Sequence, residues 1–219
     1  MDGNTNKYKL KAVIFDLDGV ICFTDTYHYQ AWKAIADAQG IYFDEKINNR
    51  LRGVSRMDSL DIILERSERS YSAGEKEKLA RQKNEIYRDL LKKMTPEDLP
   101  QDVKATLEAL KERELKVAVG SSSKNTKMIL RQIGLEGFFH AVSDGTNITF
   151  SKPNPEVFLK AADMLGLQPG ECLVVEDAEA GIQAAHNGGF LSAGLGAASD
   201  YEWTDYPLKR VSDILNVIK

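Results

Sequence analysis

Short apolar runs alternate with helical patterns along most of this sequence. Each run has the length of a strand, and most runs end at Gly, Ser or acidic residues. The runs lie at residues 11–15, 115–119, 139–142, 172–175 and 190–195, and apolar residues recur at helical spacing in 103–113, 124–133, 155–165 and 178–187. This alternation predicts an α/β fold with a doubly wound, Rossmann-like parallel sheet. Ligands of such sheets bind beyond the carboxyl ends of the strands.

The stretch from residue 24 to about residue 96 breaks this alternation. It has no strand pattern and only helical ones. Asp58 is placed to cap one helix, and Ser72 with Glu75 has the spacing of a capping box before another. An unstructured insertion of this length would be unusual inside a compact domain. We therefore expect two units, an α/β core of residues 1–23 and 97–219 and an inserted α-helical domain of residues 24–96.

Composition limits the class of protein. The chain has 219 residues, of which 42% are apolar and 28% charged, and its net charge is -4, as in ordinary globular proteins. The sequence has no basic patch of the kind that binds nucleic acid. No apolar run is long enough for a membrane span or a signal peptide. Cys22 and Cys172 predict two reduced thiols in a cytoplasmic protein. Three scattered histidines argue against zinc, and we expect a monomer because no exposed apolar helix is indicated.

Two aspartates follow the first apolar run. Residues two apart on an extended segment project to the same side, so Asp16 and Asp18 can serve one site. Gly19 permits a sharp turn away from the strand. Acidic residues are also common in surface turns, and a solvated turn would explain this fragment equally well by itself.

Other strand ends supply what phosphoryl chemistry at a carboxylate needs. A carboxylate attacks a phosphate only when positive charge offsets the repulsion between them. Glu176 and Asp177 offer hard oxygen ligands for Mg²⁺, and Lys152 can supply an ammonium group. Ser121 can bind phosphate through its hydroxyl and the adjacent backbone N–H groups. Each piece alone could be a solvated side chain or a helix cap, but their shared position at strand ends and helix starts favours one site.

The segments that carry these residues resemble the four motifs of the haloacid dehalogenase (HAD) superfamily. The segments are Asp16-Leu17-Asp18-Gly19, Ser121, Lys152-Pro153 and Glu176-Asp177. The resemblance covers nearly the whole chain and implies a HAD-like core with an inserted α-helical cap domain. It implies that Asp16 is the nucleophile that forms an aspartyl phosphate, and that Asp18 is the general acid and base.

The same resemblance assigns the rest of the catalytic set. It implies that Ser121 binds the transferring phosphoryl group and that Lys152 neutralises charge around the nucleophile. It also implies a Mg²⁺ site formed by Asp16, the backbone carbonyl of Asp18, Glu176 and Asp177. An Asp at position 18 implies transfer to or from an oxygen, which needs proton transfer. A phosphatase and a phosphomutase both meet this requirement.

The inserted segment is similar to the cap of the β-phosphoglucomutase family. The similar segments, which include one stretch of the core, are residues 24–32, 51–56, 58–59, 82–84 and 123–125. The likeness implies a phosphomutase that interconverts β-D-glucose 1-phosphate and D-glucose 6-phosphate, with β-glucose 1,6-bisphosphate as activating intermediate. The alternative is a magnesium-dependent phosphatase of small sugar phosphates, and a third hypothesis is a non-catalytic phospholigand-binding protein on the same fold.

The family also implies a set of substrate-binding residues. They are Thr24, His28, Trp32, Arg52, Gly53, Arg56, Ser59, Lys83, Ser123, Lys124 and Asn125. Arg56 has a planar guanidinium that suits a phosphate, and it would bind the phosphate that is not transferred, together with residues 123–125. Lys83 would contact the sugar.

Three of these residues are spaced four apart. Thr24, His28 and Trp32 can therefore fall on one helix face. By spacing alone they could equally form an ordinary helix end with a partly buried His and Trp. The family implies that Thr24 holds Asp18 in position and that His28 cooperates with it.

The chain departs from the family pattern in a few places. Cys22-Phe23 stands where a Thr-Asp pair is usual, at the expected hinge, so we expect cap opening and closing to differ. Arg52 stands where Lys is usual, which keeps the charge and changes the geometry. The first ten residues extend beyond the usual start, and no function is assigned to them.

Overall fold

The computed structural model describes residues 9–51 and 55–218. Its core is a six-stranded sheet in the order β3-β2-β1-β4-β5-β6, in which neighbouring strands are parallel. The strands are β1 (Ala12–Phe15), β2 (Lys116–Gly120), β3 (Ala141–Ser143), β4 (Cys172–Glu176), β5 (Leu191–Gly194) and β6 (Tyr206–Pro207). Phe15 lies opposite Val119 of β2 and Val175 of β4. The residues that follow these three central strands therefore meet at one edge of the sheet.

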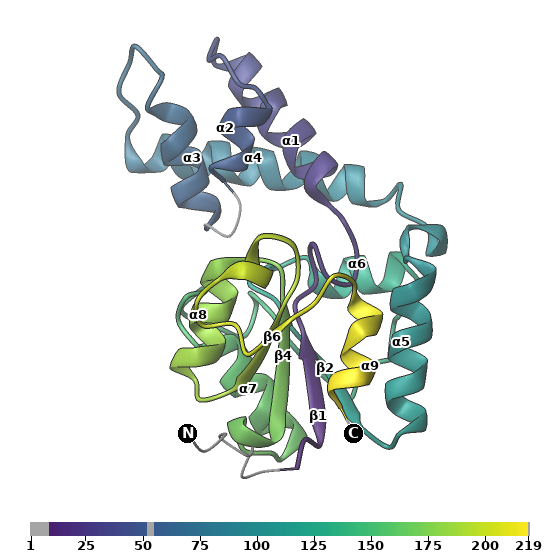
Figure 1. Ribbon diagram of the computed structural model, residues 1–219. Helices are drawn as coiled ribbons and strands as arrows, with labels where there is room; N and C mark the ends of the chain where they lie inside the picture. The colour runs from purple at the N-terminus through teal and green to yellow at the C-terminus, as the bar shows by residue number, and fades with distance from the viewer. Residues whose placement is uncertain (1–8, 52–54, 219) are drawn as a thin grey trace.

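Helices cover both faces of the sheet (Figure 1). They are α5 (Gln101–Glu112), α6 (Thr126–Gln132) and α9 (Ile214–Val217) on one face, and α7 (Glu156–Leu165) and α8 (Glu179–Asn187) on the other. Alternate residues of β1 face opposite layers: Val13 and Phe15 belong to the cluster that includes Leu107, and Ile14 belongs to the cluster that includes Phe158. The core is thus a three-layer α/β sandwich, which confirms the predicted fold class.

The observed elements differ from the predicted ones mainly in their bounds. The five predicted strands are all present, but β3 begins at Ala141 rather than at residue 139. The sixth strand, β6, was missed because a two-residue strand is too short to show a hydrophobic period. Among the described residues, four short 3-10 helices join the elements: η1 (Pro96–Asp98), η2 (Pro169–Glu171), η3 (Gly196–Asp200) and η4 (Val211–Asp213).

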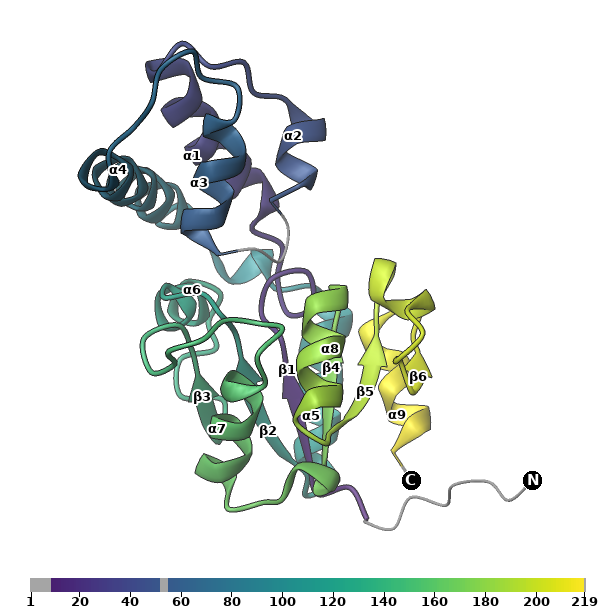
Figure 2. The same ribbon diagram turned by 90° about the vertical axis from the view of Figure 1, so that its left-hand side faces the viewer.

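In the described residues between β1 and α5, the regular elements are helices. They are α1 (Asp25–Ala38), α2 (Glu45–Asn49), α3 (Arg56–Leu64) and α4 (Ala73–Leu91). Trp32, Leu60 and Leu79 belong to a hydrophobic cluster separate from those of the core. Figures 1 and 2 place these helices beyond the carboxyl ends of the central strands, so they cover the edge where ligands bind. We call this segment the cap; its predicted bounds, 24–96, remain a prediction.

Local caps decide where the helices of this segment begin. The predicted capping box at the start of α4 is present, with Ser72 and Glu75 bonded reciprocally. The prediction that Asp58 caps α3 is wrong: Ser55 is the N-cap, and its Oγ accepts from the Asp58 N–H at 3.2 Å. The helix begins earlier because Ser is an equally good cap. Helix α2 was not predicted, and it is capped by Asp44.

The C-terminal half of α4 joins the cap to the core. Tyr87 and Leu91 are buried in the same cluster as Val20 and Cys22.

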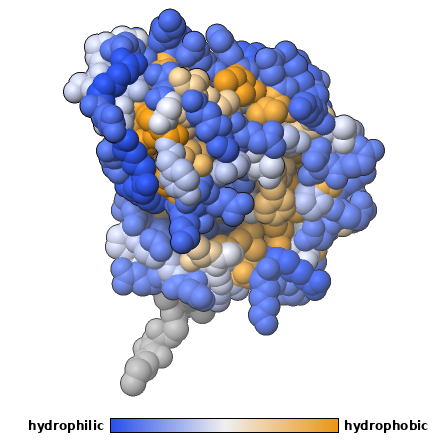
Figure 3. All heavy atoms as spheres, turned by 90° about the horizontal axis from the view of Figure 1, so that it is seen from above, coloured by the Kyte–Doolittle hydropathy of each residue, from blue (hydrophilic) through white to orange (hydrophobic). Residues whose placement is uncertain are grey.

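No helix in the described part of the chain is long and apolar enough to cross a membrane. Seen from the cap side, hydrophilic side chains cover most of the surface, and apolar side chains show in separate patches (Figure 3).

Candidate active site

Three carboxylates meet at the edge of the sheet beneath the cap. Asp16 follows β1, Glu176 ends β4, and Asp177 comes next; one oxygen of each lies within 4.8 Å of the others. Two glycines leave room for them. A Cβ on Gly19, which has a φ of +88°, would lie 2.0 Å from Asp177 Oδ2, and a Cβ on Gly181 would lie 2.0 Å from Glu176 Oε1. Backbone therefore approaches these carboxylates closely on two sides.

Lys152 lies between two of these carboxylates. Its Nζ donates to Asp16 Oδ1 and, at 2.5 Å, to Glu176 Oε1. Although burial lowers the pKa of Lys152, the two carboxylates outweigh it and raise the pKa above its ordinary value. Lys152 is therefore a permanent positive charge at the candidate nucleophile.

One ammonium group does not neutralise three carboxylates. Burial, and then repulsion from Asp16, raise the pKa of Glu176 to about 7 although Lys152 opposes the shift. Burial and its acidic neighbours raise the pKa of Asp177 to about 8. Groups with raised pKa values and hard oxygen atoms are the donor set that a divalent cation such as Mg²⁺ binds. The residues present therefore fit the predicted metal site.

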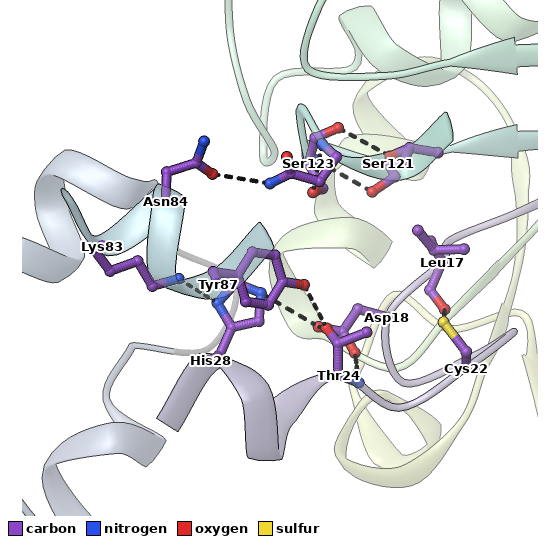
Figure 4. A network of polar contacts seen from close by, with 12 residues as sticks. Leu17, Asp18, Cys22, Thr24, His28, Lys83, Asn84, Tyr87, Ser121 and Ser123 are labelled. Atoms are coloured by element: carbon purple, nitrogen blue, oxygen red, sulfur yellow. Dashed lines mark hydrogen bonds and ion pairs between the residues drawn. The ribbon is translucent and has the colours of Figure 1, made fainter. Parts of the chain in front are cut away.

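Asp18 is held by the first residue of the cap. Its Oδ1 accepts from the Thr24 N–H at 2.8 Å, and its Oδ2 accepts from Thr24 Oγ1 at 2.6 Å. The Tyr87 hydroxyl donates to the same Thr24 Oγ1 at 2.9 Å (Figure 4). Thr24 is the N-cap of α1, yet its side chain makes no capping bond because it serves Asp18 instead. Partial burial raises the pKa of Asp18 to about 6, against these hydrogen bonds.

His28 approaches Asp18 from the cap. Its Nε2 lies 3.8 Å from Asp18 Oδ2, and its Nδ1 lies 2.8 Å from Lys83 Nζ. When Lys83 is protonated its ammonium group can only donate, so Nδ1 accepts and the proton of the neutral ring sits on Nε2, on the side of Asp18. Burial, and then the charges of Lys83 and Arg56, hold the pKa of His28 well below its ordinary value. His28 is therefore a neutral ring at neutral pH, and its Nε2 faces Asp18 Oδ2 at a distance too long for a hydrogen bond.

Two cationic side chains of the cap lie close to this network. Arg56 begins α3, and burial lowers its pKa. Lys83 is 2% exposed; burial and the charge of Arg56 lower its pKa to about 7. Its Nζ lies 4.8 Å from the centre of the Trp32 ring and 4.5 Å from that of Tyr87, so the aromatic rings partly replace the lost water.

The loop after β2 folds back on itself. Ser121 Oγ accepts from the Ser123 N–H at 3.2 Å, and Ser123 Oγ accepts from the Asn125 N–H at 3.2 Å. A hydroxyl that accepts one hydrogen bond can still donate its own proton, so both serines could donate to a phosphate. Asn125 Nδ2 donates to Asn84 Oδ1 of the cap at 3.0 Å. The loop thus touches the cap as well as the core.

The other predicted substrate-binding residues are placed in different ways. Trp32 and Ser59 are buried, at 2% and 4% exposure, and Lys124 is exposed. Arg52 and Gly53 lie outside the described residues. The structure thus brings Thr24, His28 and Lys83 together around Asp18, and Trp32 lies beneath Lys83 rather than open to the site. Binding roles for these residues remain predictions.

A groove between cap and core opens next to Lys152. Its volume is about 760 Å³, and its lining includes Ser55 and Asp58 of the cap and Phe150 and Lys152 of the core. This volume is in the range of small-molecule sites.

At the hinge, Cys22 is fully buried and Phe23 is 65% exposed. Both cysteines are free thiols, as predicted.

Two members of the site were given no role by sequence reasoning. Tyr87 supports Thr24, and Asn84 contacts Asn125. Tyr87 lies four residues after Lys83 in α4, so the helical period could have placed it on the same face. Asn84 lies in segment 82–84, which resembles the family, but its contact could not be predicted because its partner is 41 residues away in the sequence.

Comparison with known proteins gives consistent matches. The family model of haloacid dehalogenase-like hydrolases matches residues 10–189. A β-phosphoglucomutase of Bacillus subtilis is 42% identical over 94% of this chain and 92% of its own length. A phosphorylated carbohydrates phosphatase of Thermotoga maritima is 29% identical over 82% of both chains. The crystal structure of a β-phosphoglucomutase from Clostridium difficile superposes with a TM-score of 0.86 at 36% identity, covering 94% of this chain and 93% of that one.

Proposed function

The chain belongs to the haloacid dehalogenase-like hydrolase family, and within it we propose that this protein is a phosphomutase that interconverts β-D-glucose 1-phosphate and D-glucose 6-phosphate. The observation that carries the proposal is that basic side chains lie near the catalytic carboxylates on both the core and the cap side. Lys152 lies in the core beside Asp16, and Arg56 and Lys83 lie in the cap beside the Asp18 network. A mutase needs both because its intermediate carries two phosphates.

Asp16 is the proposed nucleophile. One of its carboxylate oxygens forms a bond to phosphorus while the bond from phosphorus to the sugar oxygen breaks, which leaves an aspartyl phosphate. Lys152 offsets the charge that gathers on the transferring oxygens, and Ser121 donates to them. Mg²⁺, held by Asp16, Glu176, Asp177 and the backbone carbonyl of Asp18, supplies further positive charge when it is bound.

Asp18 is the proposed acid and base. It takes the proton from the C6 hydroxyl when that oxygen attacks the phosphoryl group on Asp16, which yields β-glucose 1,6-bisphosphate. The bisphosphate then reverses its orientation between core and cap. Asp18 returns the proton to the C1 oxygen as Asp16 accepts the C1 phosphoryl group. A pKa of about 6 suits a group that must both take and give a proton near neutral pH.

The cap is proposed to bind the phosphate that is not transferred. Arg56 would bind it from one side, and the loop of Ser123, Lys124 and Asn125 from the other. Arg52, Gly53 and Ser59 complete the proposed set, with Trp32 placed beneath Lys83. The cap must also exclude water, because water would hydrolyse the aspartyl phosphate.

A phosphatase of small sugar phosphates is the second candidate. The similarity to a phosphorylated carbohydrates phosphatase supports it, since such an enzyme would use the same catalytic carboxylates. We favour the mutase because Asp18 is bonded to Thr24 and approached by His28. Proton transfer is then tied to the position of the cap. The cytoplasmic location and the monomeric state remain predictions.

The test measures two products in parallel. The protein is incubated with Mg²⁺, β-glucose 1-phosphate and a trace of the 1,6-bisphosphate, and glucose 6-phosphate is followed by a coupled dehydrogenase alongside free phosphate. We expect glucose 6-phosphate without matching phosphate release; phosphate release alone would identify a phosphatase. Asp16→Asn should abolish turnover. Arg56→Ala should spare hydrolysis of small esters and cripple isomerisation, and equal loss of both would count against the role of Arg56.

A further inference from the structure

We propose that Asn84, on the cap helix α4, is a positioning residue that turns the amide group of Asn125 toward the phosphate that is not transferred. The inference rests on the proposed function for its ligand, a sugar that carries two phosphates. It adds a residue to which no role has been given above, and it explains how binding at the core loop is linked to the position of the cap.

The contact that carries this inference crosses from the core to the cap. Asn125 Nδ2 donates to Asn84 Oδ1 at 3.0 Å. Figure 4 shows Asn84 pointing from its helix toward the loop that holds Ser121 and Ser123. Asn125 is only 7% exposed, so its amide is withdrawn from most bulk water. A buried amide needs partners, and Asn84 supplies one of them.

The Asn125 side chain makes this contact instead of capping its own helix. It is the N-cap of α6, a position where an Asn side chain usually accepts a hydrogen bond from the helix. Its side chain makes no such capping bond. The amide is therefore committed to the interface between core and cap and does not stabilise the helix.

The direction of the hydrogen bond fixes which end of the Asn125 amide faces the cap. An Asn side chain can rotate about its last torsion and present either its oxygen or its NH₂ group. A phosphate dianion only accepts hydrogen bonds, so only the NH₂ group can bind it. In this structure the oxygen of Asn84 faces Asn125, so it holds the NH₂ group of Asn125 on the cap side. One N–H is bonded to Asn84, and the second is the donor offered to the phosphate.

A second hydrogen bond between the same two helices provides a matched control. Gln132 Nε2, at the other end of α6, donates to the Leu91 carbonyl of α4 at 3.3 Å. It also joins core to cap, but it lies about 10 Å along α6 from Asn125 at 1.5 Å per residue. Loss of this bond should weaken the contact between α4 and α6 without affecting the orientation of the Asn125 amide.

The experiment measures binding with turnover blocked. All variants carry Asp16→Asn, and β-glucose 1,6-bisphosphate is titrated by calorimetry in the presence of Mg²⁺. Asn84→Ala should raise Kd about tenfold, the effect of losing one oriented hydrogen bond to a charged group. Gln132→Ala should leave Kd unchanged. With Asp16 restored, Asn84→Ala should lower isomerisation of β-glucose 1-phosphate more than hydrolysis of acetyl phosphate, because that ester has no second phosphate.

A double-mutant cycle decides whether Asn84 acts through Asn125. Asn125→Ala should also raise Kd, and adding Asn84→Ala should then cause no further loss. Independent, multiplicative losses would overturn the inference, as would an unchanged Kd in Asn84→Ala. The outcome is separate from the proposed function. A protein that shows the Asn84 effect but does not isomerise glucose 1-phosphate would refute the mutase and keep the inference, and a protein that does not bind the bisphosphate would refute both.

Discussion

Replacing Gly181 with alanine should damage the catalytic centre from inside a helix. A methyl group on Gly181 would lie 1.9 Å from Cδ and 2.0 Å from Oε1 of Glu176, whereas carbon atoms in contact stay about 3.5 Å apart. Glu176 is 1% exposed, and its carboxylate accepts from Lys152 Nζ at 2.5 Å and from the Ala178 N–H at 3.2 Å. The carboxyl group must therefore move, and it must give up part of this bonding.

The expected magnitude combines opposing effects. Alanine in place of glycine inside a helix gains up to about 1 kcal/mol. Overpacking costs about 1–3 kcal/mol, and separation of a buried ion pair costs about 3–5 kcal/mol. These costs are not additive, and we expect Gly181→Ala to lose about 2–4 kcal/mol of unfolding free energy. Displacement of Glu176 should also weaken Mg²⁺ binding about 10–100-fold.

The assay is urea denaturation with a parallel Mg²⁺ titration. Gly74→Ala is the matched control, because it is the same change in helix α4 and a Cβ there would meet nothing within 4 Å. The control should keep its metal affinity and be as stable as the parent or slightly more stable. A Gly181→Ala protein that behaves like the control in both measurements would show that Gly181 does not make room for Glu176.

The remaining predictions concern protonation around the site. Lys83→Met removes an ammonium group that donates to His28 and repels its charged form, so the pKa of His28 should rise toward 6.5. An NMR titration measures this pKa, with Lys76→Met as control. An unchanged pKa of His28 in Lys83→Met would contradict the contact. The pKa of Asp177 is raised from 3.8 to about 8, so its contribution to the stability of the metal-free protein is present below pH 3.8 and is lost as pH rises to about 8. Mg²⁺ needs the deprotonated group, so its addition should raise Tm more at pH 8 than at pH 6, and equal increases would argue against Asp177 as a ligand.

The sequence by itself determined the layout of the core. Strands buried on both faces read as short apolar runs, so the five longer strands and the helices between them were predicted, with bounds shifted by one or a few residues. Because parallel strands end at a common edge, Asp16, Glu176 and the start of the Ser121 loop could be expected to meet there. The motifs at these strand ends also identified the family, since each motif consists of a few residues that are neighbours in the sequence.

Only the tertiary structure decided how the cap meets this edge. Tyr87 and Thr24 are 63 residues apart, and Lys83 and His28 are 55 apart, so no local period could pair them. Ser55 rather than Asp58 caps α3, and the sequence could not rank the two because both residue types are good N-caps. The pKa values of Asp18, Lys83 and His28 follow from burial and from charges brought in by separate helices. Local spacing sets which side chains a strand or helix presents, but the water a side chain loses and the partner it gains depend on segments that only folding brings together.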